Sequence, residues 1–173
     1  MTALLEDLRT DRLLLRPLRA DDLPAVLEIQ TDPRTHLHDS YLAGPEEVRQ
    51  LFEAWLRHWA DHGFGYLTVV EQATGAVIGI GGVQERELDG ERVLNLFYRF
   101  RPSAWGKGYA AEMAGTVVDW AERTLPGLPV VVITNVGNAP ARRVAEKLGF
   151  AVDKEADYQG APAVYYRRRV GRR

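Results

Sequence analysis

Apolar residues recur at two spacings along the chain, and these spacings predict about four helices and seven strands. Apolar positions three or four residues apart predict helices over 21–32, 45–62, 110–125 and 138–148. Continuous or alternating apolar runs predict strands over 12–16, 66–71, 76–88, 93–100, 130–134, 152–158 and 163–170. Residues 34–44 have no regular period, so we expect a loop there.

Turn signals and strand composition indicate how these elements connect. Asp89-Gly90 predicts a tight hairpin turn, and Gly160-Ala-Pro162 predicts a turn between the last two strands. Val130–Thr134 is apolar throughout and stands between two helices, as a strand buried on both faces does. The order β-α-α-β-β-β-α-β-α-β-β predicts a mixed α/β (α+β) fold. We expect one domain over 1–173, with a core of about 10–170 and a mostly antiparallel twisted sheet containing one strand–helix–strand crossover.

Composition excludes several classes of function. The chain has 173 residues, of which 46% are hydrophobic, enough for a packed core. It has no cysteine, which excludes disulfides, thiolate metal sites and a cysteine nucleophile. A net charge of −2 argues against a nucleic-acid or membrane partner, although an arginine-rich end at 167–173 would suit one. No apolar run approaches the ~20 residues of a membrane span, and the first residues lack a basic signal, so we expect a cytoplasmic protein.

The loop Trp105-Gly-Lys-Gly-Tyr-Ala110, between a strand and a helix, carries the first candidate chemistry. The first amides of a helix have no backbone partner, and glycines let a ligand approach them closely, so the loop can hold a phosphate. Lys107 and Arg101 add positive charge. The alternative is a tight turn whose glycines serve only steric needs.

Two other phosphate-binding motifs do not fit this loop. Gly106-Lys-Gly-Tyr-Ala-Ala111 matches the G-x-G-x-x-A pattern of dinucleotide-binding folds. That pattern needs an acidic residue about 20 positions further on, and Val130–Asn135 contains none. A P-loop needs Ser or Thr after Gly-Lys, where this chain has Gly108.

The chain resembles the GNAT N-acetyltransferases over nearly its full length, and in particular the branch that acetylates the N-terminal alanine or serine of ribosomal proteins. The resemblance rests on four segments in family order: Thr10-Asp-Arg-Leu-Leu-Leu-Arg-Pro-Leu18, Gly75-Ala-Val-Ile-Gly79, Ala104-Trp-Gly-Lys-Gly-Tyr-Ala-Ala-Glu112 and Asn138-Ala-Pro-Ala-Arg-Arg-Val-Ala-Glu-Lys-Leu-Gly-Phe150. It implies acetyl-CoA as cosubstrate and an amine as acceptor. It also implies a V-shaped split of the sheet between the fourth and fifth strands, Val93–Phe100 and Val130–Thr134.

The same resemblance implies which residues form the site. The cofactor-binding residues would be Phe100, Arg101, Trp105, Gly106, Lys107, Gly108, Tyr109, Ala110, Asn138 and Arg142. The loop backbone would hold the pyrophosphate, the backbone of Phe100 and Arg101 would contact the pantetheine arm, and the Asn138 side chain would bond that arm. Arg142 is a candidate for a nucleotide phosphate, with a solvated helix residue as the alternative. The candidate catalytic residues are Asn138 and Tyr98.

Without a cysteine an acyl-cysteine relay cannot occur, so we expect the amine to attack the thioester directly in a ternary complex. The general base is open between water and three residues of the unpatterned segment: His36, His38 and Asp39. Asn95 stands where many relatives carry Glu, and Ala141 and Ala145 stand where relatives often carry Ser and Tyr.

Two alternatives to this reading stay open: a non-catalytic acyl-CoA-binding module, and an interaction or nucleic-acid-binding protein that uses the arginine-rich end at 167–173. The three inert side chains at Asn95, Ala141 and Ala145 also fit a non-catalytic acyl-CoA-binding module. His58 and His62 stand one helical turn apart, as some zinc ligands do, but without a third ligand we expect no metal site. The acceptor, a protein N-terminus or a small amine, and the choice between monomer and homodimer are not determined.

Overall fold

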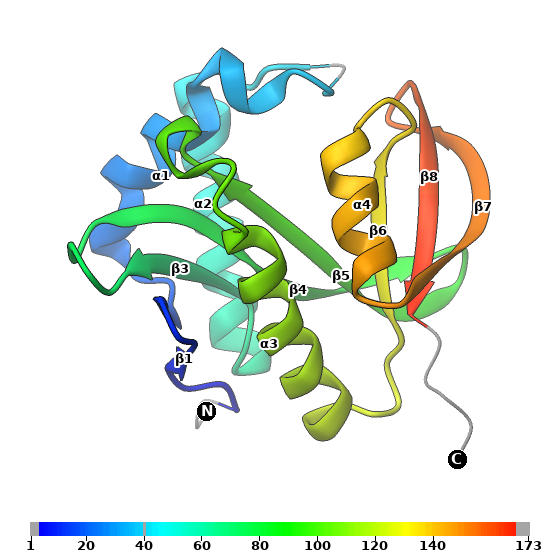
Figure 1. Ribbon diagram of the computed structural model, residues 1–173, viewed down its shortest axis with the longest axis horizontal. Coiled ribbons are helices and arrows are strands. Elements are labelled where there is room, and N and C mark those ends of the chain that lie inside the picture. Colours follow the sequence, from blue (N-terminus) through cyan, green and yellow to red (C-terminus); the bar gives the residue numbers. More distant parts are fainter. Residues whose placement is uncertain (1–3, 40, 169–173) are drawn as a thin grey trace.

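The computed structural model describes residues 4–39 and 41–168, whose strands form an eight-stranded sheet in the order β1-β2-β3-β4-β5-β6-β8-β7 (Figure 1). The strands are β1 Leu8–Arg9, β2 Leu13–Pro17, β3 Tyr66–Glu71, β4 Val77–Leu88, β5 Glu91–Phe100, β6 Val130–Asn135, β7 Phe150–Tyr158 and β8 Ala161–Arg168. The helices are α1 Leu23–Thr31, α2 Pro45–His62, α3 Tyr109–Thr124 and α4 Ala139–Lys147. Three short 3-10 turns, at Ala20–Asp22, Pro33–His36 and Pro102–Ala104, complete the set.

The sheet is antiparallel apart from one pair, β5 with β6, which run parallel. Helix α3 connects these two strands, which is the strand–helix–strand crossover expected from the sequence. The prediction of a mixed α/β fold on a mostly antiparallel sheet is therefore confirmed.

Helices cover both faces of the sheet, because successive side chains of a strand point to opposite faces. Tyr66 of β3 packs with the buried residues of α1 and α2, including Val26 and Trp55. The next residue, Leu67, packs in the other cluster with Met113 of α3. In Figure 1, α3 and α4 accordingly stand on one side of the sheet.

The sheet splits where β5 leaves β6. Pairing between these strands is limited to Leu94 with Val130 and Asn95 with Val131. β5 stays paired with β4 as far as Phe100, while β6 turns away and pairs with β8 (Figure 1). This is the V-shaped split predicted between the fourth and fifth sequence-predicted strands, and it leaves the second half of β5 without a strand neighbour on that edge.

Several local expectations were wrong. The segment expected to be a loop begins with the turn Pro33–His36, which Asp32 caps by accepting a hydrogen bond from the Arg34 amide. The last hairpin turns at Gln159-Gly160, both with positive φ (51° and 84°), so β8 already begins at Ala161. Only the first half of β6 is buried, because its second half lines the split. Residues 169–170 of the last predicted strand lie outside the described residues.

Candidate active site

Two cavities meet at the split. The loop cavity, about 660 Å³, is lined by the loop 104–111, by α4 and by Phe100. The tyrosine cavity, about 360 Å³, is lined by Tyr41, Tyr66 and Tyr158 and by the open half of β6. Both cavities are lined by His38, Asp39, Tyr98, Arg99, Asn138 and Ala141. These shared residues mark the junction where a group in one cavity can reach a group in the other.

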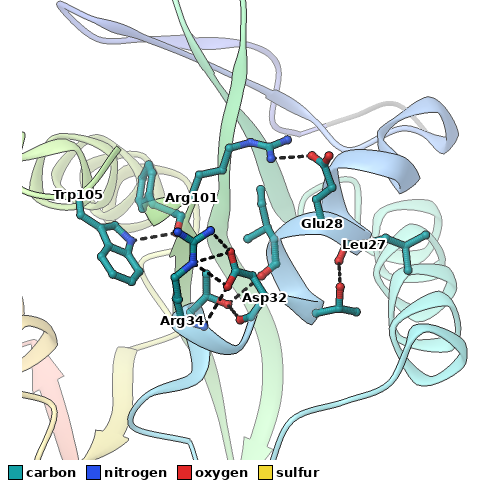
Figure 2. A network of polar contacts seen from close by, with 10 residues as sticks. Leu27, Glu28, Asp32, Arg34, Arg101 and Trp105 are labelled. Carbon is teal, nitrogen blue, oxygen red and sulfur yellow. Dashed lines mark hydrogen bonds and ion pairs between the residues drawn. The ribbon is translucent and has the colours of Figure 1, made fainter. Parts of the chain in front are cut away.

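The open edge of β5 presents backbone groups to this junction. The Leu94 amide donates to Pro129 on the β6 side, whereas the Arg101 amide donates to Ile78 of β4. Because backbone groups alternate between the two neighbours of a strand, those of Tyr98 and Phe100 face the split. The Phe100 carbonyl accepts a hydrogen bond from Trp105 Nε1 at 3.0 Å (Figure 2).

Two glycines of β4 determine where the rings of Tyr98 and Phe100 lie. A Cβ added at Gly81 would lie 2.8 Å from Tyr98 Cβ and 2.8 Å from Met113 Cε. A Cβ added at Gly79 would lie 2.7 Å from Phe100 Cδ1. The missing side chains therefore let both rings rest on β4, which holds Tyr98 at the junction.

The loop cavity ends at the N-terminus of α3. Gly108 is the N-cap of this 16-residue helix, and no side chain caps it within the described residues. Gly106 and Gly108 have φ of 74° and 78°, a conformation that residues with a Cβ rarely adopt. The first-turn amides and the positive end of the helix dipole therefore stay open toward the cavity, as an anion site requires.

Thr10 and Arg12, near the start of the chain, hydrogen-bond to Glu112 in the first turn of α3. Glu112 accepts hydrogen bonds from Thr10 Oγ1 at 2.5 Å and from the Arg12 amide at 3.0 Å. Burial acts to raise the pKa of Glu112, but the hydrogen bonds from Thr10 and Arg12 outweigh it and lower the pKa. Tyr109 donates to Glu71 at 2.6 Å, and the Arg12 guanidinium lies over its ring. The ionised Glu112 thus ties β1 and β2 to the first turn of α3.

Asn138 and Tyr98 both lie at the junction. The Asn138 Oδ1 accepts a hydrogen bond from the Ala141 amide at 3.2 Å and caps α4, which leaves its Nδ2 hydrogens for another partner. Burial raises the pKa of Tyr98 to about 12, so its phenol stays protonated and can donate a hydrogen bond.

Three cations that the sequence analysis placed near the cofactor do not line the loop cavity. The Arg101 side chain turns toward α1, where it donates to Glu28 at 2.6 Å (Figure 2). It also donates to the Val77 carbonyl of β4 at 2.7 Å. Arg142 donates to the Tyr166 hydroxyl at 2.9 Å and to the Val136 carbonyl, on the β8 side of α4. Lys107 is exposed and does not line the loop cavity. The charge expected from Arg101, and the phosphate role suggested for Arg142, are therefore not supported.

Two other cations, both on α4, do line the loop cavity. Arg143 and Lys147 line the loop cavity together with Pro140 and Val144. These residues recur at spacings of three and four, so they form one face of the helix, while Arg142 belongs to another. The helical spacing of residues 138–148 predicts that these four residues share one face of the helix, but it does not predict which face lines the cavity.

The three candidate bases differ in what they contact. His36 has Nδ1 2.6 Å from Asp39 Oδ2 and Nε2 2.6 Å from the Gln30 carbonyl. Both partners are acceptors, so the ring makes both bonds only with a proton on each nitrogen and has no lone pair for another.

Asp39 also accepts a hydrogen bond from Arg99 at 3.0 Å. Burial acts to raise the pKa of Asp39, but the hydrogen bond from His36 and the charge of Arg99 lower it, which makes a weak base. His38 is exposed, lines both cavities, and has no hydrogen-bond partner in the part of the chain described.

Two further features of the sequence have structural partners. His58 Nδ1 lies 2.9 Å from the Phe64 carbonyl, and its Nε2 accepts from the Glu85 amide at 3.1 Å, so both ring nitrogens are engaged. In the arginine-rich end, Arg167 pairs with Glu91 and Arg168 with Glu122, while the following residues lie outside the described part. None of the described helices is long and apolar enough to cross a membrane.

The split sheet and the glycine loop at a helix N-terminus are the arrangement that the resemblance to acetyltransferases implied, and the comparisons agree. Residues 12–151 match the family model of the acetyltransferase (GNAT) domain, so the chain belongs to the GNAT acetyltransferase family. It is an acyltransferase whose cosubstrate is acetyl-CoA. The resemblance to the GNAT family seen in the sequence is thereby confirmed.

Individual relatives extend along most of the chain. An uncharacterized N-acetyltransferase of Schizosaccharomyces pombe is 28% identical over 159 residues, covering 83% of each chain. A solved acetyltransferase from Agrobacterium tumefaciens is 29% identical, with a TM-score of 0.83 over 98% of each chain. The ribosomal L7/L12 alpha-N-protein acetyltransferase RimL, solved with coenzyme A, has a TM-score of 0.76 at 16% identity, covering 94% of this chain and 97% of its own. That last likeness concerns the fold alone.

Proposed function

We propose that the chain transfers the acetyl group of acetyl-CoA directly to a primary amine in a ternary complex. The observation that carries this proposal is the junction of the loop cavity and the tyrosine cavity at the open edge of β5. A cosubstrate in one cavity and an acceptor in the other would meet there. The absence of cysteine leaves direct attack as the simplest route.

Acetyl-CoA fits the loop cavity by charge and by shape. The amides from Gly106 to Ala110, in the loop and the first turn of α3, would hold the pyrophosphate, and Arg143 and Lys147 would add charge at the opposite wall. The backbone of Tyr98 and Phe100 and the Nδ2 of Asn138 would bond the amides of the pantetheine arm. When bound, the thioester supplies an activated acetyl group.

The acceptor amine must lose a proton, and we propose that His38 is the general base that accepts it. The ring borders both cavities and has no hydrogen-bond partner among the described residues, unlike His36 and the paired Asp39. A positioned imidazole that accepts a proton contributes roughly 10²- to 10⁴-fold to a rate. An α-amine, with an ordinary pKa of about 7.7–8.0, would need this help less than a lysine amine.

Tyr98 would stabilise charge and would not deliver a proton. A phenol of pKa about 12 is a much weaker acid than a thiol of ordinary pKa about 8.5, so Tyr98 would not protonate a departing thiolate. It would donate a hydrogen bond to the developing negative charge. The thiolate can leave unassisted, which explains how Ala141 at the junction is compatible with turnover.

The test is to incubate the protein with acetyl-CoA and a panel of amines and peptides and to follow free thiol. The chain has no cysteine, so every thiol detected is released CoA. Mass spectrometry should find one N-acetylated product for each CoA released. Acetyl-CoA binding without thiol release from any acceptor would identify a non-catalytic module instead.

A further inference from the structure

The tyrosine cavity is rich in hydrogen-bond donors at the end formed by β4, β3 and β7. Arg86 donates through NH1 to the Tyr158 hydroxyl at 3.0 Å. Asn95 Nδ2 donates to the Tyr66 hydroxyl at 3.4 Å. Both phenol oxygens therefore already accept a hydrogen bond, and each still has its own hydrogen to donate.

Tyr66 is the most constrained of these donors, with 2% of its surface exposed. Burial raises the pKa of Tyr66, against smaller opposing effects of Arg86 and Asn95, so the hydroxyl keeps its proton. A buried donor without an acceptor is costly, and a ligand with acceptor atoms would remove that cost.

The cavity has no free carboxylate to match these donors. Among the described residues that line it, Asp39 is the one acid, and it is already paired with His36 and Arg99. A cationic acceptor such as a polyamine or an aminoglycoside would need unpaired acids here. An acceptor with its own negative charge would instead be attracted to Arg86.

We propose, on the basis of the proposed function, that the acceptor is a small amino acid whose carboxylate is bound by Arg86 with the hydroxyls of Tyr66 and Tyr158. Its amine would then point along the cavity toward His38 and Tyr98 at the junction. One unpaired guanidinium matches the single charge of a carboxylate better than the double charge of a phosphate. The cavity volume of about 360 Å³ is that of a small-molecule site.

The experiment compares matched acceptors that differ only in this charge. Amino acids of increasing spacer length, from glycine to 4-aminobutyrate, are each paired with the corresponding amide. For the best pair, the acid should exceed the amide in kcat/KM by about 10- to 100-fold, the range of a charged hydrogen bond. The Arg86→Gln variant should lose that ratio, because the KM for the acid should rise far more than the KM for the amide.

Arg92→Gln is the matched control, because Arg92 is an exposed arginine on the adjacent strand that pairs with Glu85 outside the cavity. It should keep the wild-type ratio. A calorimetric titration with N-acetylglycine and with its amide reads carboxylate binding without turnover, and only the acid should bind more weakly to Arg86→Gln.

Three results would overturn the inference. Neutral amines or peptide N-termini could be acetylated as well as any amino acid, O-phosphoethanolamine could be the preferred acceptor, or the acid-to-amide ratio could survive Arg86→Gln. Each of these leaves the N-acetyltransferase itself intact. Failure to acetylate any amine, combined with no preference for N-acetylglycine over its amide, would overturn both proposals.

Discussion

The loop cavity and the tyrosine cavity share a junction, but the first is formed mainly by backbone groups and the second mainly by side chains. The loop cavity depends on backbone: the first-turn amides of α3, two glycines with positive φ and the open edge of β5. The tyrosine cavity depends on side chains from β3, β4, β7 and the segment after α1. A site formed by backbone groups can bind the same ligand in proteins of different sequence, whereas a site formed by side chains can change its ligand with each substitution. The contrast matches a common cosubstrate and a variable acceptor.

The largest effect is expected at the junction, where a change should affect chemistry without emptying either cavity. His38→Gln should lower kcat by roughly 100-fold or more, the lower bound for losing a general base. Acetyl-CoA affinity should stay within about two-fold. Steady-state kinetics and calorimetry measure the two quantities.

His62→Gln is the control for His38→Gln, because His62 pairs with Glu85 outside both cavities. It should keep wild-type kcat. Equal kcat for His38→Gln and wild type would assign the proton to water.

Tyr98→Phe should lower kcat by about 100-fold, as the loss of one hydrogen-bond donor to developing charge does. Tyr165→Phe removes the same atom outside both cavities and should have no effect on kcat.

Because burial raises the pKa of Tyr98 to about 12, the phenol stays protonated as the pH rises past 10. The wild-type rate should therefore show no loss near pH 10, where an ordinary tyrosine ionises. A downturn there that disappears in Tyr98→Phe would contradict the assignment.

Gly106→Val should affect the loop cavity and not the tyrosine cavity, and it should weaken acetyl-CoA binding by about 10-fold. The loop would lose close approach of its amides, worth about one hydrogen bond. Gly75 has nearly the same φ (73° against 74°) and open space around it, but it does not line the loop cavity.

Gly75→Val therefore controls for backbone strain. Both variants should unfold more easily, by about 1–2 kcal/mol, and only Gly106→Val should weaken binding. Equal affinities in the two variants would mean that the loop does not hold the cosubstrate.

The smallest effect is expected from the exposed cations of α4. Arg143→Gln and Lys147→Gln should each weaken acetyl-CoA binding about two- to five-fold at low salt, as exposed charges do. The difference should shrink in 0.5 M salt, where exposed charges are screened. Arg142→Gln, whose side chain faces Tyr166, should not show this salt dependence; if it alone did, the orientation of α4 would be wrong.

The sequence predicted the parts of the molecule that depend on local patterns. The glycine loop, the period of α3 and α4 and the apolar run of β6 helped to predict the order of elements, and the resemblance to the GNAT family implied the place of the split. These patterns did not predict that Pro33–His36 forms a turn. Asp32 caps this turn, and Arg99 of β5, which is far away in sequence, donates a hydrogen bond to its backbone. The Gln159-Gly160 turn was missed because glutamine rarely adopts a positive φ.

The side chains of the site were harder to predict. Arg101 and Arg142 carry positive charge close in sequence to the loop and to Asn138, but their directions are fixed by Glu28 and Tyr166, which only the fold brings near. Arg86 had no local signal at all, because its role depends on Tyr66 and Tyr158 from two other strands.

The meeting of the two cavities is tested most directly by a conjugate that fills both. CoA joined through its sulfur and an acetyl linker to the nitrogen of the best amino acid acceptor should bind roughly 100-fold more tightly than CoA, since the second contact becomes intramolecular. Calorimetry measures this gain in affinity, and Arg86→Gln should remove most of it. A conjugate that binds no more tightly than CoA would contradict the account, because the loop cavity and the tyrosine cavity would then not form one site.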